Sequence, residues 1–81
     1  MITVLEFSRG HLRISTGDVI VRVLGEMTVD PLGFVVFDQL PVMSENGVEL
    51  MPEDVSDLHS ELRSQFLHKD RRFWLESELA E

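Results

Sequence analysis

Asp57, His59 and Ser60 are the side chains of this 81-residue chain whose types could form an acid, base and nucleophile triad. They lie in a segment whose apolar spacing predicts a helix. At about 100° per residue, the three side chains spread over roughly 300° around that helix. A hydrolytic triad needs its groups in line, so we expect no nucleophilic catalysis from this segment.

The histidines are too dispersed for a metal site. His59 and His68 are nine residues apart on the predicted helix and point to opposite sides, while His11 falls in a predicted strand. We expect His59 at the rim of the apolar helix stripe. The chain has no cysteine, no calcium loop and no glycine-rich phosphate loop. The sequence therefore predicts no metal, no cofactor and no enzymatic activity.

Acidic residues outnumber basic residues by 15 to 7, which gives a formal net charge of −8. This charge argues against direct nucleic-acid binding and is compatible with electrostatic steering toward a basic protein partner. Solubility alone is the other explanation of the charge. Five carboxylates in the strand, turn and loop segments are the candidate partner-binding residues: Glu26, Asp30, Asp38, Glu45 and Glu49.

Turn signals divide the first half of the chain into short strands. We predict strands at residues 2–7, 11–15, 19–28 and 34–37. Connections this short join neighbouring strands in antiparallel hairpins, so the four strands form a meander. The turn Asp30-Pro31-Leu32-Gly33 is a strong one, because proline sets φ at its second position and Gly33 is free to adopt a positive φ.

One helix and one further strand follow the loop at residues 41–51. Pro52 suits the first helical position, and the helix should end near Lys69 and Asp70. The carboxylates of Asp54, Asp57 and Glu61 lie opposite the apolar stripe and should face solvent. The stripe consists of Val55, Leu58, Leu62 and Phe66. Residues 72–76 predict a fifth strand, at an edge of the sheet or beside the first strand.

These elements predict a single α+β domain over residues 1–76. Its curved antiparallel meander of four strands, plus the C-terminal strand, should carry one α-helix packed on one face. Residues 77–81 are expected to form a flexible acidic tail. No apolar run approaches the roughly 20 residues of a membrane span, and the start of the chain lacks a basic leader, so we expect a cytoplasmic protein.

Gly25 and Glu26 interrupt the long third strand, which is apolar on both faces. The helix covers one face only, so a curled part of the sheet, the 41–51 loop or a second copy must cover the other; a homodimer is one alternative. The second strand ends opposite about Val23, and the third strand overhangs beyond it. We interpret Gly25 as a bend that folds this overhang over the open face, with Glu26 at the rim. The alternative is that Glu26 is a binding or catalytic carboxylate.

The order of these features resembles the immunity protein 74 family of bacterial polymorphic toxin systems. The resemblance covers residues 9–76 and is carried by GDVIVRVLGEM, GFVVFDQL, LMPEDV and RFWLE. It implies a non-enzymatic protein that neutralises a toxin by binding and occluding it. A nuclease toxin has a basic groove, to which an acidic protein would be steered. The alternative function is a homo-oligomeric structural or regulatory module.

Overall fold

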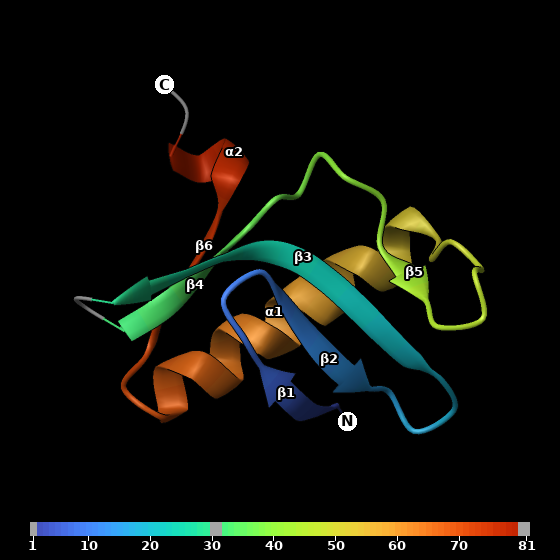
Figure 1. The fold of residues 1–81 in the computed structure, drawn as a ribbon, viewed down its shortest axis with the longest axis horizontal. Helices are drawn as coiled ribbons and strands as arrows, with labels where there is room; N and C mark the ends of the chain where they lie inside the picture. The colour runs from blue at the N-terminus through green and yellow to red at the C-terminus, as the bar shows by residue number, and fades with distance from the viewer. Residues whose placement is uncertain (1, 30–31, 80–81) are drawn as a thin grey trace.

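The computed structural model describes residues 2–29 and 32–79, and in them a six-stranded sheet packs against one long helix (Figure 1). The strand order is β1-β2-β3-β4-β6, and β5 also pairs with β3. The strands are β1 (Thr3–Phe7), β2 (His11–Ser15), β3 (Ile20–Val29), β4 (Leu32–Val36), β5 (Met43–Ser44) and β6 (Arg72–Leu75); the helices are α1 (Pro52–His68) and α2 (Glu76–Leu79).

The first four strands form the predicted antiparallel meander. Its long strand β3 is curved in Figure 1 and changes partners along its length. Residues 20–24 pair with β2, and residues 25–29 pair with β4. The short strand β5 pairs with β3 at Val21 and Arg22. The curved α+β fold predicted from the sequence is confirmed.

The C-terminal strand lies at the edge of the sheet and runs parallel to β4, with Phe34 opposite Phe73. Of the two placements predicted for this strand, the edge is correct and the position beside the first strand is wrong. The reason is the connection: α1 carries the chain back across the sheet, and a long helical crossover returns a strand in the parallel direction.

The hydrophobic core lies between one face of the sheet and α1. Pro52 opens the helix as predicted, and its buried residues include Leu58, Leu62 and Phe66. Phe66 contacts the rings of Phe7 and Phe73, each with a centroid separation of 5.5 Å. The core residues of the sheet are contributed by alternate positions: Leu12, Ile14, Val21, Val23, Phe34, Val36 and Phe73. We call this the inner face of the sheet and the opposite side the outer face.

Gly25 is explained by a close approach rather than by the predicted folding back of the strand. The inward and outward alternation of β3 continues through it, and Gly25 itself is buried on the inner face. A Cβ atom at this position would lie 2.4 Å from the Phe34 ring and 2.1 Å from the carbonyl oxygen of Val35. The far half of β3 therefore extends the same core instead of covering the outer face. Glu26 is exposed on the outer face.

Leu32 and Gly33, which were predicted to lie in a turn, belong to β4. Gly33 is free to adopt a positive φ, but it does not have one in the structure. Instead, a Cβ there would lie 2.4 Å from the carbonyl oxygen of Arg72. Glycine at this position lets β6 approach β4 closely.

Residues 77–79, predicted as part of a flexible tail, lie in α2. Two contacts attach this short helix to the rest of the molecule. Ser77 hydrogen-bonds through its backbone N–H and its hydroxyl to the carboxylate of Asp38, and Arg63 forms an ion pair with Glu78 at 2.8 Å. The domain contacts therefore continue beyond residue 76.

Candidate functional site

A groove of about 460 Å³ lies between the first half of α1 and the turn that joins β2 to β3. Its apolar walls come from Ile2, Val19, Leu50 and Leu58. Four carboxylates also line it, and no lysine, arginine or histidine does: Asp18, Asp54, Asp57 and Glu61. We call this site the acidic groove.

Local folding explains how the carboxylates come to this groove. Asp54 and Asp57 lie in the first two turns of α1, where negative charge is favourable near the positive end of the helix dipole. Asp18 is brought opposite them by the turn at Gly17, whose φ is +102°. Glu61 accepts a hydrogen bond of 2.9 Å from the backbone N–H of Ile2 and so fixes the start of the chain against the helix.

Three carboxylates of the acidic groove are available to a positively charged side chain. The side chains of Asp18, Asp54 and Asp57 make no hydrogen bond or ion pair within the part of the chain that the structure describes. A lysine or arginine side chain can lay its aliphatic stem along apolar walls while its charged end meets carboxylates. The groove therefore has the shape and charge to accept a basic side chain.

Four of the five carboxylates predicted from the sequence are described by the structure; these four do not form one site, and none of the four lines the acidic groove. Glu26 is exposed on the outer face, and Glu49 is exposed in the loop after β5. Glu45 also points to the outer face, whereas Asp38 lies beside α2. Asp30 lies outside the described residues.

Sequence reasoning missed the acidic groove although part of its signal was present. Asp54, Asp57 and Glu61 recur at i, i+3 and i+7, which places them on one face of a helix. We expected that face to be solvated only. The unforeseen feature is that the turn with Asp18 closes over one side of it, and no local pattern connects segments so far apart.

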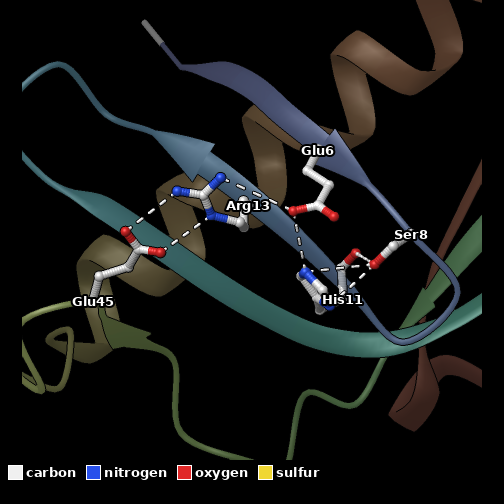
Figure 2. A network of polar contacts seen from close by, with 5 residues as sticks. All are labelled: Glu6, Ser8, His11, Arg13 and Glu45. Atoms are coloured by element: carbon white, nitrogen blue, oxygen red, sulfur yellow. Dashed lines mark hydrogen bonds and ion pairs between the residues drawn. The ribbon is translucent and has the colours of Figure 1, made fainter.

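A charged network crosses the outer face (Figure 2). Arg13 donates hydrogen bonds of 3.1 and 3.4 Å to Glu45, and its guanidinium lies 4.0 Å from Glu6. The hydrogen bond and charge of Glu45 raise the pKa of Arg13. His11 is 3.5 Å from Glu6 and 3.0 Å from the hydroxyl of Ser8. These groups are partly solvated, so the network orders side chains more than it stabilises the fold.

Beside this network, the outer face carries a band of apolar side chains. Leu24 is 41% exposed at the middle of β3. Phe37 lies next to it, with its backbone N–H bonded to the carbonyl of Leu24 at 2.9 Å. Val35 and Trp74 pair across β4 and β6 and point away from the core, because their neighbours Phe34 and Phe73 point inward. No described helix covers this band (Figure 1).

His59 is buried rather than at the rim as predicted, because α2 and the segment after β4 lie against α1. It is 9% exposed, and its Nε2 atom has no hydrogen-bond partner among the described residues. Burial lowers the pKa of His59, and the nearby carboxylate of Asp38 only partly opposes this effect. For Asp38, burial acts to raise the pKa, but the hydrogen bonds from Ser77 outweigh it and leave the pKa lowered.

The triad considered in the sequence is separated in space. Asp57 lines the acidic groove, whereas His59 and Ser60 line a different groove of about 580 Å³ on another side of α1. Within residues 2–29 and 32–79, no group of three or more histidine and carboxylate side chains could hold a metal ion. None of the described helices is long and apolar enough to cross a membrane.

Comparison of the chain with protein-family models, with curated proteins and with solved structures gives no match. Its function must therefore be inferred from its surfaces. Two of them stand out: the acidic groove, and the apolar band of the outer face with its flanking charges.

Proposed function

We propose that this chain is a non-enzymatic binding protein that takes a basic segment of a partner protein into the acidic groove. The observation that carries the proposal is a set of three carboxylates in a concave site with apolar walls, Asp18, Asp54 and Asp57, which have no partners among the described residues. An arginine or lysine of the partner would enter the groove and offset part of their negative charge.

The charge of the whole molecule supports the same conclusion. A protein of net charge −8 attracts a basic partner over distances beyond direct contact and accelerates the encounter. Complementary charges across an interface mainly raise the association rate and exclude wrong partners. We therefore expect association that is fast at low ionic strength and slows as salt is added.

The resemblance to the immunity protein 74 family suggests who the partner is. We propose a basic toxin domain, which this protein would neutralise in the cytoplasm by occluding its functional surface. Such a role needs no catalytic group on this chain. It needs an acidic surface, and carboxylates in the first turns of α1 contribute to one.

The test is binding to the toxin encoded by an adjacent reading frame, with paired variants of equal net charge. Asp54→Asn with Asp57→Asn removes two groove carboxylates, whereas Glu49→Gln with Glu53→Gln removes two exposed carboxylates outside the groove. We expect the groove pair to weaken binding by about tenfold or more, which corresponds to about 1.4 kcal/mol, and the control pair to change it much less.

Isothermal titration calorimetry at two salt concentrations, together with cell survival on co-expression, gives the readout. Equal weakening by both variant pairs would show that net charge rather than the groove binds the partner. No binding of the wild-type protein to the adjacent toxin would refute the immunity role.

A further inference from the structure

The outer face of β3 carries a row of side chains whose charge reverses about its centre. Arg22, Leu24 and Glu26 alternate with inward residues and so point to the same side of the strand. Leu24 is half-exposed at the centre, and the flanking side chains are exposed. A positive and a negative charge thus lie at equal distances on either side of an apolar residue.

Neither of these charges is paired within the part of the chain that the structure describes. Among the described residues, Arg22 and Glu26 make no side-chain hydrogen bond or ion pair. Four residues along a strand separate them by about 13 Å, which is too far for a direct contact with each other. The neighbouring cation Arg13 differs, because Glu45 and Glu6 already neutralise it.

We propose that the outer face binds a second copy of this chain, so that the two outer faces pack against each other. The two-fold axis lies between the two faces, passes between the two Leu24 side chains and runs across the strands, at right angles to β3. This symmetry lays the two β3 strands over each other in opposite directions. Arg22 of each copy then lies over Glu26 of the second copy, which forms two identical ion pairs around a Leu24–Leu24 contact. Such an isologous contact is the commonest arrangement of homodimers.

The segments on one side of β3, which are β4 with Phe37 after it and β5, are complementary under the same symmetry. Phe37 lies beside Leu24, so it meets Phe37 of the second copy. Val35 pairs with Glu26 and Met43 pairs with Arg22, so Val35 of one copy meets Met43 of the other. The proposed contact therefore has an apolar centre flanked by charged pairs, which is the usual composition of a protein interface.

This charge pattern favours a second copy over an unrelated partner. A partner with one dominant charge sign would be attracted to one end of the row and repelled by the other end. A second copy of the row, turned by 180°, places an opposite charge over each end. The dimer leaves the acidic groove open, because the groove lies on the α1 side of the sheet. The inference is thus independent of the proposed function.

Charge reversal tests the pairing. The wild type should have twice the 9.3 kDa mass of one chain in multi-angle light scattering at concentrations of tens of micromolar. Arg22→Glu alone and Glu26→Arg alone should each run as monomers, because each places like charges together. An equimolar mixture of these two variants should restore the dimer, since each copy then offers the charge that the other lacks.

Lys69→Glu at the C-cap of α1 and Glu53→Arg in its first turn change exposed charges by the same amounts and should leave the dimer intact. Circular dichroism verifies that all variants remain folded. A monomeric wild type would overturn the proposal. A dimer that survives Arg22→Glu, or two variants that remain monomeric when mixed, would do the same for this face and this symmetry.

Discussion

At the scale of single residues, the absence of a side chain at Gly25 allows the Phe34 ring to pack against β3 in the core. The Phe34 ring lies on the inner face of β3 where any other residue would place its Cβ. Phe34 in turn makes an edge-on contact with Phe7 at 5.9 Å, so the ring links the β3–β4 hairpin to β1. The glycine is required by packing, and no positive φ is involved.

Gly25→Ala should therefore destabilise the protein by about 2 kcal/mol, as expected when an extra methyl is forced into a filled core. Urea unfolding followed by circular dichroism measures this loss. Gly10→Ala is the matched control, because a Cβ there meets nothing within 4 Å, and its effect should stay within about 0.5 kcal/mol. Equal stabilities of the two variants would show that the Phe34 ring and the Val35 carbonyl both move aside freely.

At the scale of elements, α2 depends on a carboxylate from another part of the chain. Asp38 accepts a hydrogen bond of 3.1 Å from the backbone N–H of Ser77 and a second one from its hydroxyl. Glu78 accepts a bond of 2.9 Å from the backbone N–H of Leu75, and this bond, followed by that from Arg63, lowers the pKa of Glu78. A helix of four residues would not persist without such contacts.

Asp38→Ala should release α2 while the sheet stays intact. We expect amide hydrogens of residues 75–79 to exchange about fivefold faster, a loss of about 1 kcal/mol for a partly solvated charged acceptor. Hydrogen–deuterium exchange with mass spectrometry resolves this segment. Gln39→Ala, an exposed neighbour, is the control. Unchanged exchange at residues 75–79 would mean that the contacts of Glu78 alone hold the helix.

The sequence allowed most elements to be predicted, because strands and helix carry their own periodicity. Alternation located β2 and β3, and Pro52 with the apolar stripe located α1. The parallel pairing of β6 with β4 could not be predicted, since nothing near residue 73 indicates which strand 39 positions earlier it will contact. The same limit applies to the acidic groove, which joins Asp18 to carboxylates of α1.

At the scale of the whole molecule, the acidic groove and the outer face differ in how their charges are arranged. The α1 side presents the acidic groove, and the outer face presents cations and carboxylates in mixed order. A surface of one sign suits a basic partner, and a surface of alternating sign suits a copy of itself. The two proposed partners, a basic protein and a second copy, therefore use different sides of the sheet, although the net charge of −8 belongs to both.

The stability of the whole fold should fall in mild acid because of His59. In the unfolded chain it titrates near 6.5, whereas in the folded protein burial lowers its pKa, with Arg63 acting in the same direction and Asp38 and Glu78 against it. The unfolded state therefore binds the proton first. Stability is complete above about pH 6.5 and decreases below it until the folded pKa is passed, by at most about 1.4 kcal/mol per pH unit.

Replacing the titrating group should remove this loss. His59→Leu fills a similar volume and deletes the unpartnered Nε2, so its free energy of unfolding should vary less between pH 7 and pH 5 than that of the wild type. His68→Leu changes an exposed histidine and should keep the wild-type slope. Urea unfolding at each pH supplies the comparison. If His59→Leu retained the full slope, the acid sensitivity would have to come from other groups, because only a group whose pKa differs between the folded and unfolded states makes stability depend on pH.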